Sequence, residues 1–295
     1  SSQGDGRLHS IYLLSATRTG RLSADLEEGG SLLLTPRDDW MRDLIASLDP
    51  DWEIHAADYS QVELRMIAWL APEPAMRTLY EEGADLHATT AAYAKSGLPV
   101  QEFWRKRKAL VRKVTKDERQ AGKSNNFGWV FLMQADRYQK YAKNNYGITL
   151  TLEEAADAHD DFFKLYPGLQ AWHDRVARED YERGYTVNPF GRYRFGLTDL
   201  SQFINTPIQQ TATDLTLLAM IVIDERLQIE VPEAQIIGFV HDAILVLAPK
   251  SARKRVQEII KTSMEQPPLE RVGIDEIPVP LVADVKTGKT WARAQ

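Results

Sequence analysis

The hydrophobic pattern around residue 60 predicts a strand that leads directly into a helix. Residues 52–57 form a short, mostly apolar run of strand length, and the run ends at Asp58. Residues 61–70 then carry apolar side chains at helical spacing, namely Val62, Leu64, Met66, Ile67, Trp69 and Leu70. Asp58 is therefore expected at a strand-to-helix junction, where an aspartate can also be no more than a helix N-cap or a turn former.

A second pattern, far along the chain, predicts a β-hairpin. The apolar, β-branched runs 236–240 and 244–247 each have the length of a strand. Between them lie His241, Asp242 and Ala243. The tip of the hairpin is therefore expected to be polar, with an aspartate at its centre.

These two aspartates would indicate metal binding if the first strand and the hairpin are neighbours. Asp58 and Asp242 would then face each other, and two facing carboxylates repel and raise one pKa unless a cation lies between them. Two Mg²⁺ ions in such a site can activate an attacking hydroxyl and stabilise a leaving phosphate, as in polymerases and nucleases. His241 has no spacing that indicates a zinc ligand, and its simpler interpretation is a packed or hydrogen-bonded histidine.

Basic and aromatic residues form a stripe on a predicted helix near the middle of the chain. Arg119, Lys123, Phe127 and Phe131 are spaced four apart, so they drift only slowly around a helix. Such a stripe can hold an anionic tail at one end and a flat ring at the other, which is the shape of a nucleoside triphosphate. The alternative is an amphipathic helix whose aromatic residues belong to the core. Glycines within this segment weaken the helix, so it needs tertiary packing or a close backbone approach.

The composition narrows the class of protein. The chain has 295 residues, of which 43% are hydrophobic, and this excludes a disordered chain. Its net charge of -6 argues against a protein that coats nucleic acid, although nine basic and two acidic residues within 105–123 give a local charge of +7. Such a run can also be a solvated helix face. The chain has no cysteine, which fits a reducing compartment, and no apolar run long enough to span a membrane.

Three segments, in this order, resemble the motifs of family A DNA polymerases, the bacterial DNA polymerase I group. Residues 58–65 resemble the first polymerase motif, 119–131 the fingers-helix motif and 240–242 the third motif. Shorter segments agree along nearly the whole chain: 19–23, 85–87, 166–168, 191–194, 205–209 and 283–288. The resemblance implies an α+β fold, in which a polymerase palm with a small antiparallel sheet carries a mostly helical fingers subdomain.

The resemblance also implies roles for individual residues. Asp58 and Asp242 would be catalytic and would ligate two Mg²⁺ ions, with the backbone carbonyl of Tyr59 as a further ligand. Glu63 would act as a steric gate under the 2′ position of the sugar, so DNA is the implied product. The incoming dNTP would be bound by Glu63, His87, Arg119, Lys123, Phe127 and Phe131. Primer-template DNA would be bound by Arg21, Arg192, Asn205, Gln209 and His241.

Four residues depart from the pattern of that family. Ala243 stands where a glutamate is usual, which removes a negative charge near the metal ions. Phe131 stands where a tyrosine is usual, so the hydroxyl that would bond the gate glutamate is missing, and we expect a looser sugar gate. Leu132 replaces a glycine, and Ser201 stands where an arginine is often found, which removes one primer contact.

The resemblance divides the chain into palm segments at 1–84 and 186–295 and a fingers segment at 85–185. The family carries a helical thumb and an exonuclease-like domain ahead of this region. We expect both to be absent from this chain and expect no proofreading from it. A second polypeptide of a split polymerase, of viral or phage origin, or the rest of a longer chain, is expected to supply the thumb and exonuclease domains.

The sequence therefore predicts a template-directed DNA polymerase that transfers a nucleotidyl group from dNTP to a primer 3′-hydroxyl by a two-metal mechanism. It is expected in the cytoplasm of a bacterial or phage-infected cell, with no membrane partner. Three alternatives stay open. A single-subunit RNA polymerase would carry a small residue in place of Glu63, a two-metal nuclease would cleave the primer, and a non-catalytic polymerase-like scaffold is favoured by Ala243.

Overall fold

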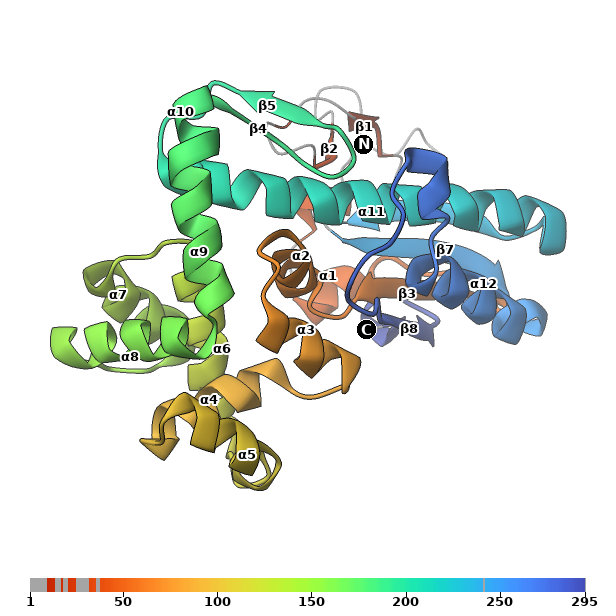
Figure 1. Ribbon diagram of the computed structural model, residues 1–295. Helices are drawn as coiled ribbons and strands as arrows, with labels where there is room; N and C mark the ends of the chain where they lie inside the picture. Colours follow the sequence, from red (N-terminus) through yellow and green to blue (C-terminus); the bar gives the residue numbers. More distant parts are fainter. Residues whose placement is uncertain are drawn as a thin grey trace.

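The chain combines a small sheet, a long helix that crosses it and a mostly helical lobe to one side (Figure 1). The computed structural model describes residues 10–13, 17, 21–24, 32–35, 38–240 and 242–294. The strands are β1 (Tyr12–Leu13), β2 (Ser23–Ala24), β3 (Trp52–Tyr59), β4 (Tyr185–Val187), β5 (Tyr193–Phe195), β6 (Gln235–Val240), β7 (Ala243–Pro249) and β8 (Ala283–Gly288). The α-helices are α1 (Asp39–Asp43), α2 (Val62–Leu70), α3 (Pro74–Glu81), α4 (Leu86–Ser96), α5 (Val100–Val111), α6 (Lys116–Val130), α7 (Ala135–Tyr146), α8 (Leu152–Leu165), α9 (Pro167–Arg175), α10 (Tyr181–Arg183), α11 (Leu200–Glu230) and α12 (Arg253–Glu265).

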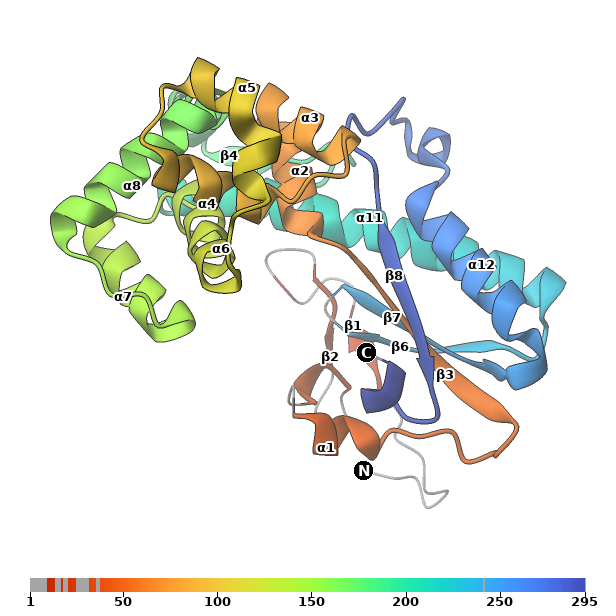
Figure 2. The ribbon, with the colours of Figure 1, turned by 90° about the horizontal axis from the view of Figure 1, so that it is seen from below.

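The central sheet is antiparallel and has the strand order β6-β7-β3-β8. One side of β3 faces α12, because the hydroxyl of Tyr59 donates to the carbonyl oxygen of Met264 at 2.7 Å. Glu53, on the same side, accepts a hydrogen bond from Arg253 Nε at 2.7 Å. Successive side chains of a strand point to opposite faces, so Asp58 faces the other side. Figure 2 shows α12 on one side of the sheet, and α1 and the C-terminus on the other.

The side of the sheet that carries Asp58 is only partly covered. Arg42 of α1 stacks over the ring of Trp291, with its guanidinium carbon 4.7 Å from the ring centroid. Around Trp291 lies a small apolar cluster, made of Leu32, Ile54, Ala56, Val240, Leu245, Trp291 and Ala294. The ends of β3 and β8 beyond this cluster stay open and border a pocket.

The helical lobe is formed by α4 to α10 (Figure 1). Asp85 caps α4, and capping boxes begin two of the longer helices, Thr115 with Glu118 at α6 and Thr151 with Glu154 at α8. The lobe contributes large buried side chains to the main core, namely Trp129, Tyr138, Phe162, Tyr166 and Leu169. These caps and this core hold α6, which carries most of the predicted stripe, in a fixed position.

Helices α4 and α6 pack closely because α6 presents a glycine to α4. A Cβ added at Gly122 would overlap the carbonyl oxygen of His87 in α4. At Gly128 an added Cβ would lie 2.6 Å from the ring of Tyr138 in α7, which is too close for a real contact. This is the close backbone approach that the glycines of the predicted helix require.

The long helix α11 holds the hairpin β4–β5 through a partly buried ion pair. Arg192, next to β5, places its Nε 3.0 Å from Oδ2 of Asp214 in α11. Asn188 donates to the same carboxylate oxygen at 2.7 Å. The hydrogen bonds and charge of Asp214 raise the pKa of Arg192. The hairpin is thus fixed to α11 at a carboxylate that is almost fully buried.

The predicted α+β fold is confirmed, and so are the elements on which the site prediction depended. The strand predicted over 52–57 is β3, which extends to Tyr59. The predicted helix begins at Val62, after Gln61 in the left-handed conformation at φ +54°. The predicted hairpin is formed by β6 and β7. The limits given above for palm and fingers stay predictions.

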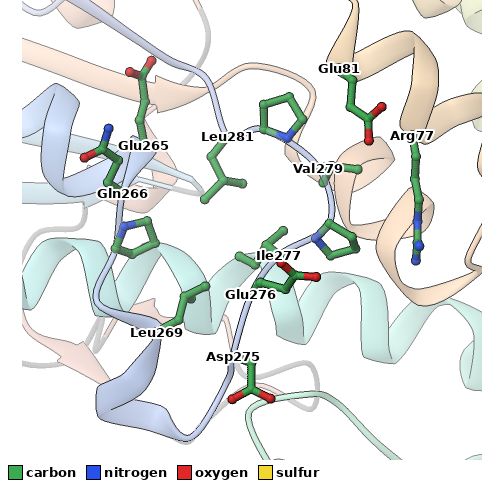
Figure 3. A pocket seen from close by; sticks show the side chains of 13 residues that line it. Arg77, Glu81, Glu265, Gln266, Leu269, Asp275, Glu276, Ile277, Val279 and Leu281 are labelled. Atoms are coloured by element: carbon green, nitrogen blue, oxygen red, sulfur yellow. The ribbon is translucent and has the colours of Figure 1, made fainter.

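A separate cavity of about 590 Å³ lies between α3 and the loop that precedes β8 (Figure 3). Arg77 and Glu81 line it from α3, Glu265 lines it from the end of α12, and Asp275 and Glu276 line it from the loop. The guanidinium of Arg77 donates to carbonyl oxygens at the end of α2. None of the predicted site residues lines this cavity, so the candidate site lies elsewhere.

Candidate active site

A pocket of about 420 Å³ opens on the side of the sheet that carries Asp58. Asp284 of β8 is the register partner of Asp58 and lines the same pocket. Asp242 lies in the turn between β6 and β7, and the pairing of β7 with β3 brings that turn to the pocket. Lys286 of β8 is a further lining residue. The structure therefore brings Asp58 and Asp242 together from strands that are far apart in the sequence.

The carboxylates of this pocket repel one another. Burial raises the pKa of Asp58, and the charges of Asp284 and Asp242 raise it further, whereas Lys286 lowers it. A divalent cation would relieve this repulsion. The described residues contain no group of three or more His, Cys, Asp and Glu side chains that could hold a metal ion. Mg²⁺ takes few protein carboxylates and completes its shell with phosphate and water.

Asp58 is not the cap of the helix that follows it. Helix α2 begins at Val62, its N-cap residue is Gln61, and no side chain caps it. The neighbour of Asp58, Tyr59, has its side chain engaged with α12 on the opposite face of the sheet. Tyr59 could therefore contribute a backbone group, but not its side chain, to a metal ion near Asp58.

Glu63 lies in the first turn of α2 and forms an ion pair with Arg21. Its Oε1 accepts a hydrogen bond from Arg21 Nη2 at 3.1 Å. Burial raises the pKa of Glu63, the charge of Arg21 lowers it, and the charge of Asp242 raises it. Glu63 is thus within electrostatic reach of the pocket. Residues 18–20, next to Arg21 in the sequence, lie outside the described residues.

Three of the four stripe residues lie on α6, and the prediction of a single helical stripe was wrong for the fourth. Phe131 is the C-cap residue directly after α6, because the backbone turns there, and Leu132 follows with φ +57°. Arg119 donates from Nε to Oδ2 of Asp85 at 2.6 Å. Within the described ranges, Lys123 forms no ion pair with a carboxylate, so its charge is available to a ligand.

His87 is buried between α4 and α6 and stays neutral near pH 7. Burial lowers its pKa to about 4, and the nearby charge of Arg119 acts in the same direction. The amide nitrogen of Asn126 donates to its Nδ1 at 2.8 Å, which leaves the ring proton on Nε2. The ring centroid lies 6.1 Å from that of Phe127. His87 can therefore offer a phosphate a neutral hydrogen bond but no positive charge.

The residues predicted to bind DNA are spread over several elements. Asn205 and Gln209 lie one turn apart on α11, and both are half-buried. Arg192 is engaged with Asp214 and fixes the β4–β5 hairpin. His241 lies outside the described residues.

Sequence reasoning missed three charged residues of the pocket and one partner in the lobe. Asp284, Lys286 and Arg42 line the pocket that Asp58 also lines, and Asp85 binds Arg119. The segment 283–288 could be recognised as a family segment, but no local pattern shows that β8 pairs with β3. That pairing joins segments more than two hundred residues apart, and it alone places Asp284 opposite Asp58.

Comparisons with known proteins agree along nearly the whole chain. The family model described as DNA polymerase family A matches residues 1–293. DNA polymerase I of Aquifex aeolicus is 34% identical over 225 residues, which cover 76% of this chain and 37% of that protein. DNA polymerase I of Streptococcus pneumoniae (strain ATCC BAA-255 / R6) is 30% identical over 315 residues, and these cover 99% of this chain and 32% of that protein.

The structural comparison agrees with the fold. The POL domain of Pol1 from M. smegmatis, in complex with DNA primer-template and dNTP, superposes with a TM-score of 0.81 at 24% identity. The match covers 99% of this chain and 49% of that one. The chain thus spans about a third of the length of its curated relatives. No described helix is both long enough and apolar enough to cross a bilayer.

Proposed function

The chain belongs to DNA polymerase family A, and from this membership we propose that it is a template-directed DNA polymerase. The proposed reaction transfers a nucleotidyl group from dNTP to a primer 3′-hydroxyl and releases pyrophosphate. One observation carries the proposal: Asp58 and Asp242 converge at one end of the sheet, within electrostatic reach of Glu63. The M. smegmatis neighbour, in complex with primer-template and dNTP, supports the choice of ligands.

Asp58 and Asp242 are proposed to hold two Mg²⁺ ions, with the backbone carbonyl of Tyr59 as a further ligand. When bound, such ions activate an attacking hydroxyl and stabilise the charge on a leaving phosphate. The residues fit the ions because their carboxylates repel each other without a cation and are the oxygen ligands that Mg²⁺ prefers. Ala243 adds no carboxylate at the hairpin, whereas Asp284 adds one from β8.

The side chains of α4 and α6 are proposed to bind the incoming dNTP. Lys123 and Arg119 would bind the triphosphate as cations, and His87 would donate a neutral hydrogen bond from Nε2. Phe127, one turn beyond Lys123, would pack on the sugar and base, with Phe131 beyond it at the end of the helix. This order along one helix supports binding of a phosphate tail at one end and a ring at the other.

Glu63 is proposed to be the steric gate that excludes a 2′-hydroxyl. Its raised pKa and partial burial support this, because an added hydroxyl would have to share a site from which water is largely excluded. Primer-template DNA is proposed to contact Arg21, Arg192, Asn205, Gln209 and His241. Such contacts position the duplex by shape rather than by sequence, as copying requires.

A thumb and an exonuclease domain are proposed to lie outside this chain, in a second polypeptide or in the rest of a longer protein. The length of the relatives supports this, because they are about three times as long as the segment they share with this chain. The relatives come from bacteria, which supports action in the cytoplasm of a bacterial or phage-infected cell.

Single-nucleotide primer extension by the purified chain with Mg²⁺ tests the proposal. We expect deoxynucleotide addition by the native chain and none by Asp242→Asn, with dNTP binding retained in that variant. Asp275→Asn is the matched control, because it neutralises an aspartate that lines the separate cavity. Equal extension by the native chain and Asp242→Asn would overturn the metal assignment.

Other outcomes of the same assay identify the alternatives. Equal use of ribonucleotides would indicate an RNA polymerase, and shortening of the primer would indicate a nuclease. Binding of primer-template without extension, also after addition of a thumb-bearing polypeptide, would indicate a non-catalytic scaffold. Ala243 is the observation that favours the scaffold, because it leaves the hairpin with one carboxylate fewer than the family pattern.

A further inference from the structure

Arg21 makes its ion pair with the residue proposed to select the sugar. Its Nη2 lies 3.1 Å from Oε1 of Glu63, across a separation of 42 residues. The side chain of Arg21 is 36% exposed and that of Glu63 is 24% exposed, so solvent only partly screens the pair. An ion pair that is only partly screened restricts the positions that the Glu63 carboxylate can adopt.

The backbone around Arg21 is fixed from two directions. Thr17 donates a hydrogen bond from its hydroxyl to the carbonyl oxygen of Arg21. Leu22, the next residue, is buried in the main core. The strand β2, which follows, pairs with β1, where the hydroxyl of Tyr12 accepts a hydrogen bond from the backbone N–H of Phe239. Arg21 is therefore tied to β6, the strand that leads to the hairpin tip.

Among the described residues, Arg21 donates a hydrogen bond from Nη2 to Glu63, and its Nε is buried without a partner. Because Nε is buried, the acceptor of a ligand would meet the exposed part of the guanidinium, and the Arg21 side chain is 36% exposed. Because the donors of arginine form a rigid fork, one guanidinium can hold Glu63 and a nucleic-acid acceptor together.

Charges from other elements also act near the Glu63 carboxylate. Arg21 forms its ion pair from the segment before β2, and the charge of Asp242 in the hairpin raises the pKa of Glu63 beyond the effect of burial. Burial raises the pKa of Tyr141 in α7, and the charge of Glu63 raises it further. The charge of Arg21 acts in the opposite direction and lowers the pKa of Glu63. Without Arg21, the Glu63 carboxylate would lose its ion-pair partner and still experience the negative charge of Asp242, so its position would be less restricted.

We propose that Arg21 is a positioning residue for Glu63, and that this ion pair sets how strongly the site rejects a 2′-hydroxyl. This rests on the proposed function and goes beyond it, because the DNA contact expected of Arg21 alone gives it no part in sugar selection. When Arg21 is present, the ion pair keeps the Glu63 carboxylate under the sugar. When Arg21 is removed, the Glu63 side chain can rotate away and a ribonucleotide can bind.

The test is a double-mutant cycle on the full chain with Arg21→Ala, Glu63→Ala and the double variant. The measured quantity is the ratio of kcat/KM for dATP to kcat/KM for ATP, together with binding of both nucleotides to a complex with a dideoxy-terminated primer, where no chemistry occurs. We expect Arg21→Ala to lower the discrimination ratio about tenfold. In the Glu63→Ala background, the same change should leave the ratio unaltered.

Two further variants distinguish loss of the positioning of Glu63 from a general loss of activity. Arg21→Lys keeps the charge but loses the fork, so it should fall between the native chain and Arg21→Ala. Arg271→Ala removes an arginine from the exposed ion pair with Glu225, which lies 2.7 Å away, and should leave the ratio unchanged. Melting temperatures of all variants show which of them fold. If Arg21→Ala does not fold, Arg21→Lys is used in its place in the cycle.

Three outcomes are distinguishable. A lowered ratio that depends on Glu63 supports the proposal. Slower use of dATP and ATP alike, with an unchanged ratio, would overturn it and leave Arg21 as a DNA contact only. A native chain that neither binds nor adds deoxynucleotides, with or without a thumb-bearing polypeptide, would overturn the proposed function itself.

Discussion

Asp58 and Asp284 face each other as register partners on the neighbouring strands β3 and β8. Side chains at such positions lie on the same face of a sheet, with Cβ atoms about 5 Å apart, and like charges there are unfavourable. Burial raises the pKa of Asp58, the charge of Asp284 raises it further, and the charge of Lys286 on the same strand lowers it. Strand β8 therefore contributes two opposing charges to the surroundings of a proposed metal ligand.

Replacement of Asp284 by asparagine should lower the pKa of Asp58 in the metal-free chain, because it removes a neighbouring negative charge. Carboxyl-carbon NMR titration measures this shift, and Asp58→Asn identifies the signal. Lys286→Met is the control of opposite sign and should raise the same pKa. If the Asp58 signal titrates at the same pH in Asp284→Asn as in the native chain, the two side chains do not interact.

The local parts of the candidate site could be predicted from the sequence. The strand before Asp58 and the hairpin around Asp242 are short apolar runs with polar ends, and such a pattern depends only on neighbouring residues. The sequence predicted that the two aspartates converge only if the first strand and the hairpin are neighbours. The residues of either segment alone do not show which strands pair. The register of β3 with β7 supplies that missing step.

The ion pairs that extend the prediction join residues of different elements. Arg192 was expected to bind DNA, and the structure also gives it a buried partner, Asp214 on α11. Arg119 was expected to bind phosphate, and the structure pairs it with Asp85 at the start of α4. A sequence shows which residues are charged, but the partner of each charge depends on how the helices pack. For that reason the residue types of the site were predictable and their ion pairs were not.

Replacement of Gly122 by alanine should destabilise the chain although alanine is the better helix former. In an exposed helix the change would gain about 1 kcal/mol. Here the new Cβ would overlap the carbonyl oxygen of His87, so α4 and α6 must separate, at a net cost of about 1–3 kcal/mol. Urea unfolding measures the difference. Asn144→Ala, at an exposed site of α7, is the control and should be neutral or slightly stabilising. Greater stability of Gly122→Ala would contradict the close approach.

Lys123 and Arg119 should respond differently to replacement by alanine. Loss of Lys123 should raise KM for all four dNTPs about tenfold or more, because it would bind phosphate and not base. Its melting temperature should not change, since no described carboxylate pairs with it. Loss of Arg119 should weaken dNTP binding and also lower stability slightly, by at most about 1 kcal/mol, because the half-exposed ion pair with Asp85 is lost while Asp85 still accepts its cap hydrogen bond from Ala88. Base-selective loss in Lys123→Ala would rule out the phosphate role.

Three buried histidines should make the chain sensitive to mild acid. Burial lowers the pKa of His55, His87 and His173 to about 4, against about 6.5 in an unfolded chain. Between these values the unfolded state binds more protons than the folded state. The free energy of unfolding therefore falls as the pH drops from about 6.5 toward 4, by up to about 1.4 kcal/mol per pH unit for each histidine.

His173→Gln tests this dependence, because glutamine can still donate the hydrogen bond that His173 Nε2 gives to the carbonyl oxygen of Val130 at 2.8 Å. The unfolding free energy is measured by urea titration from pH 8 to pH 5. Below pH 6.5 the variant should lose stability less steeply than the native chain, by about 1.4 kcal/mol per pH unit. Above pH 7 the two slopes should coincide, since the histidine is neutral in both states, and this range is the internal control. Equal slopes below pH 6.5 as well would show that His173 is protonated as readily in the folded chain as in the unfolded one.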